Sequence, residues 1–142
     1  KRTPSITEVW LVGTSMGTIS SSFMPLHNPT AYAGAVHTAS ITEPYARGSY
    51  RELGGFDYKK SQVPQFFVHH INDPCGVTTY SGAKSIAEKY GVALVTVSGG
   101  AGFQGPACAA FTEHGFRGKE KEVMNAVTAI IKTGKSSQLD IN

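Results

Sequence analysis

The sequence has no long apolar run, and this absence excludes one class of protein. No uninterrupted hydrophobic stretch approaches the roughly 18 to 20 residues that a membrane-spanning helix requires. The first residues, from Lys1 to Pro4, also lack the apolar stretch of a secretory signal peptide. We therefore expect either a cytoplasmic protein or a protein whose targeting segment lies upstream of this sequence.

Clustered positive charge is also missing. The 13 Lys and Arg residues outnumber the 10 Asp and Glu residues, but the longest basic runs are the pairs Lys1-Arg2 and Lys59-Lys60. Binding to a polyanion requires basic side chains gathered on one face or in one segment. We therefore expect no nucleic acid and no membrane among the partners.

Cysteine is scarce, with only Cys75 and Cys108 in the chain. Their spacing fits neither the paired CxxC motifs of a zinc site nor the CxxC motif of a redox protein. Either a structural disulfide or two free thiols remain possible. We expect no metal and no other cofactor.

What is present fits one globular domain spanning residues 1–142. A domain usually takes roughly 100 to 200 residues, and the chain has 142 of them. With 40% hydrophobic and 16% charged residues, the chain can bury a core and is not typical of a disordered protein.

Short apolar segments alternate with helix-compatible segments along the chain. We expect about four strands, at 8–12, 33–37, 64–69 and 92–97. We expect helices at 16–25, ending at Pro25, at 78–90 and at 119–133. This alternation predicts an α/β fold, with a mostly parallel sheet flanked by helices and right-handed crossovers.

Three stretches lack such periodicity. Residues 41–62 contain Pro, Gly and several charges, and predict a small cap or a surface excursion. Residues 98–117 predict a long loop, which in a compact domain is usually functional or mobile. We expect residues 134–142 to form a flexible tail.

The segment Gly13-Thr14-Ser15-Met16-Gly17 matches the pattern G-x-S-x-G. It lies where an expected buried strand turns directly into an expected helix, which would project the Ser15 hydroxyl above the sheet edge as a nucleophile. We expect the glycines to remove side chains that would clash in the turn. The Met16 N–H would lie at a helix N-terminus, where it can donate to an oxyanion. The alternative is a glycine-rich connection with an incidental serine.

A serine hydroxyl needs a neighbouring base, and the chain offers five histidines. His114 lies in the long loop after the last expected strand, where it can swing over the strand ends. His27 and His37 are placed as packed or surface residues. His69 and His70 end the third expected strand, where one can touch substrate or both can simply pack.

An orienting acid should follow a strand and precede the histidine in the chain, and Asp73 does both. Asn72 and Pro74 provide turn chemistry around it. The alternative is a turn residue that bonds its own backbone. The other acids to consider are Glu43, Glu52 and Asp57.

The order Ser15, Asp73, His114, each after a strand, resembles the α/β-hydrolase superfamily from Glu8 to about Thr133. More narrowly, the chain is similar to bacterial α/β-hydrolases related to the dienelactone hydrolase and prolyl oligopeptidase groups. In these proteins one cysteine follows the acid and another precedes the histidine, as Cys75 and Cys108 do here. The resemblance implies a Cys75–Cys108 disulfide, and with it a periplasmic or secreted protein; free thiols would fit the cytoplasm.

The resemblance also implies that an N-terminal half is absent, because the sheet of this superfamily has more than four strands. That half normally brings the second backbone donor of the oxyanion hole. It also pairs with the nucleophile strand, so Val9–Val12 would be left as an apolar edge. We expect another copy of the chain or a separately supplied N-terminal segment to cover this edge.

The function that follows is a serine hydrolase that cleaves carboxylic esters through an acyl-enzyme. Substrate-lining candidates are Thr14, His70, Phe103 and Phe116, although core packing explains the two phenylalanines equally well. An acyltransferase with the same triad is one alternative. The other is a catalytically weak hydrolase half that binds or depends on a partner.

Overall fold

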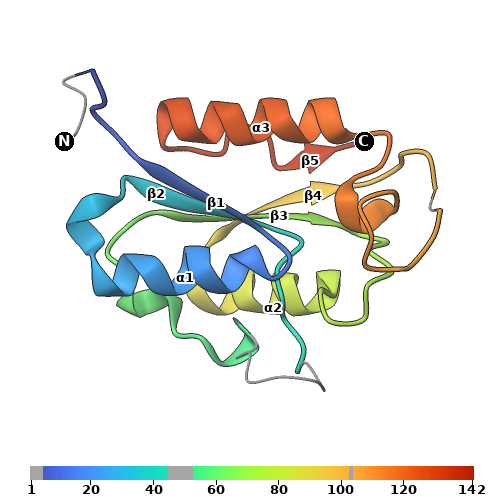
Figure 1. Cartoon of the computed structure of the whole chain (residues 1–142), viewed down its shortest axis with the longest axis horizontal. Helices are drawn as coiled ribbons and strands as arrows, with labels where there is room; N and C mark the ends of the chain where they lie inside the picture. The colour runs from blue at the N-terminus through green and yellow to red at the C-terminus, as the bar shows by residue number, and fades with distance from the viewer. Residues whose placement is uncertain (1–4, 45–52, 103) are drawn as a thin grey trace.

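The computed structural model describes residues 5–44, 53–102 and 104–142. Its centre is a five-stranded sheet in which all neighbouring strands are parallel and follow the chain order (Figure 1). The predicted α/β class with a parallel sheet is confirmed, but the expected number of about four strands is wrong. The strands are β1 (Trp10–Thr14), β2 (Gly34–Thr38), β3 (Gln65–His70), β4 (Ala93–Val97) and β5 (Asp140–Ile141).

Helices cover both faces of the sheet. Helices α1 (Gly17–His27) and α2 (Tyr80–Tyr90) lie on one face, and α3 (Glu120–Thr133) lies on the other (Figure 1). The strands are parallel and follow the chain order, so each connection leads to the next strand in the same direction across the sheet. A connection over one face of such a sheet therefore has the opposite hand to a connection over the other face. The β4–α3–β5 connection therefore differs in hand from β1–α1–β2, and the expectation of right-handed crossovers throughout is wrong.

The core has two layers because adjacent strand residues point to opposite faces. Phe66 packs in the layer under α3, while its neighbour Phe67 packs in the layer under α2. Short 3₁₀ helices at Leu53–Gly55 and Tyr58–Lys60 add to the second layer, and Leu53 and Tyr58 are buried there. The described part of 41–62 thus adds apolar side chains to the core, while its lysines and glycines are exposed. Two more 3₁₀ helices in the described residues are Pro29–Ala31 and Glu113–Gly115.

Helix α1 continues through Pro25, where we expected it to end. A proline inside a helix removes one backbone hydrogen bond, to the carbonyl four residues earlier. Near the end of a helix the loss is confined to the last turns, and the buried Pro25 ring gains packing. The helix ends instead at His27, where the Asn28 N–H donates to the Met24 carbonyl.

Within 134–142, where we expect a flexible tail, two residues form a strand. Gly134 ends α3 with a φ of 66°, and the chain returns to the sheet as β5. The open side of β4 offers unpaired backbone groups, so Thr96 N–H donates to the Leu139 carbonyl and Ser98 N–H to the Ile141 carbonyl. Ile141 is 2% exposed within the α3 layer, and one apolar side chain thus anchors a polar segment.

None of the helices in the described part of the chain is both long and apolar enough to span a bilayer.

Truncation of Ile141 tests whether β5 is part of the folded domain. We expect Ile141→Ala to lower the free energy of unfolding by about 2 to 4 kcal/mol, because a buried aliphatic side chain is lost. Leu139 is 53% exposed two residues earlier and provides the matched control. Leu139→Ala should change stability by no more than about 0.5 kcal/mol in urea titrations. Equal effects of the two substitutions would contradict the packing of β5.

Candidate active site

Ser15 lies in the turn between β1 and α1. Its φ is 53°, in the left-handed region that a residue with a side chain rarely adopts. Three hydrogen bonds hold the turn: Ser15 N–H donates to the Thr38 carbonyl at 3.0 Å, and the Ser15 carbonyl accepts from the N–H and the hydroxyl of Thr18. The strained strand-to-helix turn is the conformation that the G-x-S-x-G pattern predicts.

The two glycines of the pattern differ in their surroundings. A Cβ on Gly13 would collide with the Ser21 hydroxyl and the Gly17 backbone, so a side chain there has no room. A Cβ on Gly17 would meet open space. The expectation that the glycines prevent clashes therefore holds for Gly13 and is wrong for Gly17.

Met16 is the N-cap residue of α1. The first N–H groups of a helix have no partner within the helix, and among the described residues the Met16 N–H donates no backbone hydrogen bond. It is therefore free to bind an anionic group that lies beside Ser15. The positive end of the helix dipole strengthens such an interaction.

Asp73 and His114 are in direct contact although 41 positions separate them. The His114 Nδ1 atom lies 3.0 Å from Asp73 Oδ2 and 3.2 Å from Oδ1. The His114 side chain is 5% exposed and the Asp73 side chain is 1% exposed. The Asp73 carboxylate also accepts from the Cys75 N–H at 2.9 Å and from the Thr78 hydroxyl at 2.8 Å. The buried carboxylate is thus surrounded by donors, as a buried charge requires.

The loop that carries His114 is held by two local features. Thr112 is buried; its hydroxyl accepts from the His114 N–H at 3.0 Å and contacts the Ala107 and Ala109 carbonyls. A Cβ on Gly115 would collide with the Ala110 backbone, so glycine permits this close approach. His114 thus lies in a hydrogen-bonded turn.

Cys75 and Cys108 form a disulfide, with a Cα–Cα distance of 4.6 Å and a sequence separation of 33. The bond joins the loop of Asp73 to the segment before His114. By the chain-entropy argument it stabilises the fold by roughly 3 to 4 kcal/mol. The pairing that the resemblance implied is confirmed, and the possibility of free thiols is excluded.

The residues with candidate catalytic roles lie at the edge of the sheet that is formed by the carboxyl ends of its strands. Ser15 follows β1 and Asp73 follows β3, while His114 lies in the segment after β4. Parallel strands place their carboxyl ends at the same edge, where α/β folds hold their ligands. Asp73 and His114 are brought into contact, whereas no hydrogen bond joins Ser15 to His114 among the described residues. Such contacts are often long before substrate binds.

A groove of about 320 Å³ adjoins this edge. Thr14 and Gly115 line its wall, and they are the chain neighbours of Ser15 and His114. The groove continues along the α3 face of β1. Its other lining residues are Val12, Thr38, Ala110, Phe116, Glu120, Val123, Met124 and Val127.

Of the four expected substrate-lining residues, two line this groove. Thr14 and Phe116 line the groove, although Phe116 is also packed in the core. Phe103 lies outside the described residues. His70 is 1% exposed, and its ring is used on both sides: Nε2 contacts the Gly99 carbonyl at 2.9 Å and Nδ1 accepts from Asn72 N–H. His70 is a packed residue that joins two loops, and its placement as a substrate-lining residue is wrong.

The remaining histidines do not contact Ser15. His27 is exposed at the end of α1. His37 is buried between Ser21 and Gln65, with ring contacts to both. Burial lowers the pKa of His37 to about 4, which the hydrogen bond to Gln65 partly opposes. His37 is therefore neutral at pH 7 and is a core residue.

His69 lies behind the Asp73–His114 pair. Its Nε2 accepts from the Ser40 N–H at 2.6 Å, which leaves Nδ1 to carry the proton. Burial lowers its pKa to about 4, and the nearby Asp73 charge opposes that shift. Among the described residues, neither His69 Nδ1 nor the Ser40 hydroxyl has a hydrogen-bond partner.

Thr78 is the site residue that the sequence did not reveal. It contacts both Asp73 and His114, yet it lies in an ordinary segment before α2 and matches no catalytic pattern. The alternative acids have other roles: Glu43 accepts from the Thr79 hydroxyl and Asp57 caps a 3₁₀ helix. Glu52 lies outside the described residues.

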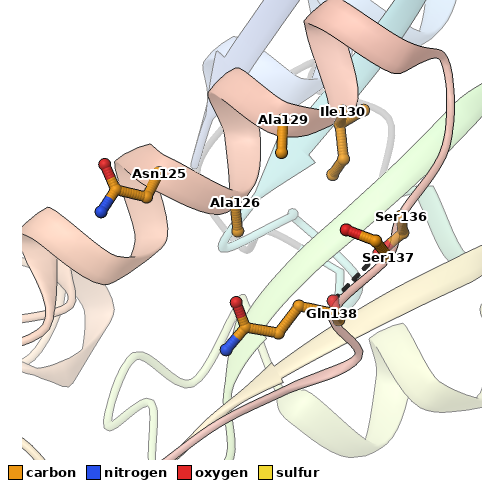
Figure 2. Close-up of a pocket in the computed structure, with 7 residues that line it drawn as sticks. All are labelled: Asn125, Ala126, Ala129, Ile130, Ser136, Ser137 and Gln138. Carbon is orange, nitrogen blue, oxygen red and sulfur yellow. Dashed lines mark hydrogen bonds between the residues drawn. The ribbon is translucent and has the colours of Figure 1, made fainter.

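The described residues offer no metal site, and a smaller hollow beside α3 offers no acid–base pair. Among the described residues, no group of three or more His, Cys, Asp or Glu side chains is arranged to hold a metal ion. A small hollow of about 90 Å³ lies between α3 and residues 136–138 (Figure 2). Its lining consists of aliphatic, hydroxyl and amide side chains, with Ser136 bonded to the Gln138 carbonyl. It offers no acid or base.

No protein-family model, no curated protein and no solved structure matches this chain. The chemistry of the site therefore has to be inferred from its own geometry.

The strain at Ser15 can be measured without any substrate. Glycine adopts a φ of 53° freely, whereas an L-residue is disfavoured there by about 1 kcal/mol or more. We expect Ser15→Gly to be about 1 kcal/mol more stable than Ser15→Ala in urea unfolding. The same pair at the helical position Ser20 should show the opposite order, because glycine weakens a helix. A more stable alanine variant at position 15 would contradict the turn.

Proposed function

We propose that this chain is the catalytic part of an α/β-hydrolase, a serine hydrolase that cleaves carboxylic ester bonds. The observation that carries the proposal is the buried Asp73–His114 contact at 3.0 Å, at the same sheet edge as the strained Ser15 turn. A buried carboxylate against an imidazole Nδ1 is the arrangement that orients a histidine as a general base. The Gly13 contact with α1 and the order of the three residues along the chain add support.

In the proposed reaction, Ser15 Oγ attacks the ester carbonyl carbon and His114 Nε2 takes the hydroxyl proton. Asp73 stabilises the imidazolium that forms. The C–O bond to the alcohol then breaks, and His114 returns the proton to the leaving oxygen. Water attacks the acyl-enzyme with His114 again as base, which releases the acid and restores Ser15.

The Met16 N–H supports the oxyanion in both steps. We identify no second donor among the described residues, and one missing donor costs about 10²- to 10³-fold in rate. An ester demands least from such a site, because its alcohol is a better leaving group than the amine of a peptide. The lack of a second oxyanion donor also favours a second candidate function, a hydrolase part that becomes active only with a partner.

Covalent labelling with a fluorophosphonate tests the nucleophile without knowledge of the substrate. We expect labelling of native chain at Ser15, found by peptide mass spectrometry, and none in Ser15→Ala. Asp73→Asn should slow labelling about 10²- to 10⁴-fold, because His114 loses its orienting acceptor. Ser20→Ala, an exposed serine on α1, is the control and should label as native. Absence of native labelling would overturn the assignment of an active nucleophile.

The unpaired outer side of β1 supports the proposal that the chain acts together with a partner. Within the described residues β1 pairs only with β2, so its outer backbone groups lack a strand partner. Val12 of this strand is 49% exposed, and Val9, which directly precedes it, is 40% exposed. Met124 of α3 is 57% exposed across the groove. An apolar open edge is prone to pair with another strand. We propose that a second copy of the chain pairs there; a separately supplied N-terminal segment is the alternative occupant.

Light scattering tests this pairing. We expect native chain to be a dimer and Val12→Lys to be a monomer, because a charge at the pairing edge opposes burial. Leu139→Lys, at an exposed position beside β5 on the opposite side of the sheet, should remain a dimer. A monodisperse native monomer would count against the second copy.

The disulfide also bears on the compartment. Such bonds persist in oxidising environments, and Cys108 is exposed to solvent and so to cellular reductants. We propose that the chain works in the periplasm or outside the cell.

A further inference from the structure

Thr78 completes a closed triangle of polar groups with Asp73 and His114. The Thr78 hydroxyl oxygen lies 2.8 Å from Asp73 Oδ2 and 3.0 Å from His114 Nδ1. The third side of the triangle is the 3.0 Å contact between Nδ1 and Oδ2. Thr78 is 0% exposed, so water does not compete for these contacts.

The protons of this triangle can be placed from the chemistry of its atoms. An ionised carboxylate only accepts, so both neighbours must donate to Asp73. The Thr78 hydroxyl has one proton, and giving it to Asp73 turns an oxygen lone pair toward His114. His114 can donate to the carboxylate only if Nδ1 carries hydrogen, and a Thr78 oxygen without a proton toward His114 accommodates that hydrogen. In the neutral ring a hydrogen on Nδ1 leaves Nε2 without one, which is the form a general base needs.

The Thr78 backbone holds the hydroxyl in place. Its N–H donates to the Cys75 carbonyl at 3.0 Å, inside the loop closed by the disulfide. The next residue, Thr79, is the N-cap of α2 and accepts from the Gly82 N–H. On the other side, the Val77 carbonyl accepts from the Thr42 N–H. The backbone that carries the hydroxyl is thus held by hydrogen bonds at Thr78 and at both of its chain neighbours.

We infer that Thr78 is a positioning residue, which holds the Asp73 carboxylate and thereby keeps His114 in its Nδ1–H form. The inference rests on the proposed function, because only a catalytic base gains from this form. Thr78 does not itself touch the reacting atoms; its hydroxyl acts through Asp73 and His114.

The first test is independent of activity. In ¹⁵N-edited NMR of the full chain, the His114 Nδ1–H proton, assigned by its loss in His114→Phe, should exchange slowly with water. Thr78→Val keeps the shape of the side chain but removes the hydroxyl, and should speed this exchange at least about tenfold. Thr78→Ser restores the hydroxyl and should exchange as native. Native-like exchange in Thr78→Val would overturn the inference.

The second test measures the fluorophosphonate labelling rate at Ser15. Thr78→Val should slow labelling about 10- to 100-fold, the effect of losing a hydrogen bond to a charged group. Thr78→Ser should stay within about threefold of native. Thr42→Val is the matched control, because Thr42 is a buried threonine that contacts Thr79 and not the triangle. It should label as native.

A double-mutant cycle separates positioning from a general effect on folding. In an Asp73→Asn background the hydroxyl has no carboxylate to hold, so Thr78→Val should change the labelling rate by less than about threefold. An equal slowing in both backgrounds would show a structural role and overturn the inference. If native chain is not labelled, the proposed function fails, and the exchange of the Nδ1–H proton still decides the role of Thr78.

Discussion

The hydrogen bond between His114 Nδ1 and Asp73 joins two loops that lie 41 positions apart in the chain. Both side chains are buried, and a buried carboxylate without partners would be strongly destabilising. The Cys75 N–H, the Thr78 hydroxyl and the imidazole together satisfy it. The disulfide and the short 3₁₀ helix at Glu113–Gly115 then hold the two loops close enough for these contacts. The relative position of these two loops depends on this one pair and the disulfide beside it.

Strain is concentrated at the same edge and is offset by neighbouring hydrogen bonds. Ser15 and Ala39 have φ angles of 53° and 45°, and they follow the ends of adjacent strands. Thr18 links the two turns, because its hydroxyl donates to the Ser15 carbonyl and accepts from the Ile41 N–H at 3.2 Å. His69 supports the second turn through the Ser40 N–H. Strained residues persist only where surrounding contacts over-determine them, as they do here.

Burial separates the histidines into different chemical classes. His37 and His69 are enclosed, and desolvation lowers the pKa of each to about 4, so both stay neutral at pH 7. His70 uses both ring nitrogens to join loops. The sequence alone places these three histidines in or at the end of strands and does not reveal this difference. Chain order and loop position single out His114 in the sequence, and the structure adds its contact with Asp73.

The sequence by itself determined the α/β class, the order of the first four strands and three helices, and the turn at Ser15. These follow from periodicity and glycine placement, which are properties of neighbouring residues. The tertiary structure alone decided that Ile141 adds a fifth strand, that α3 covers the opposite face, and that Thr78 joins the buried pair. Each of these depends on which distant groups remain unpaired or exposed once the sheet has formed, and local sequence does not encode such pairing.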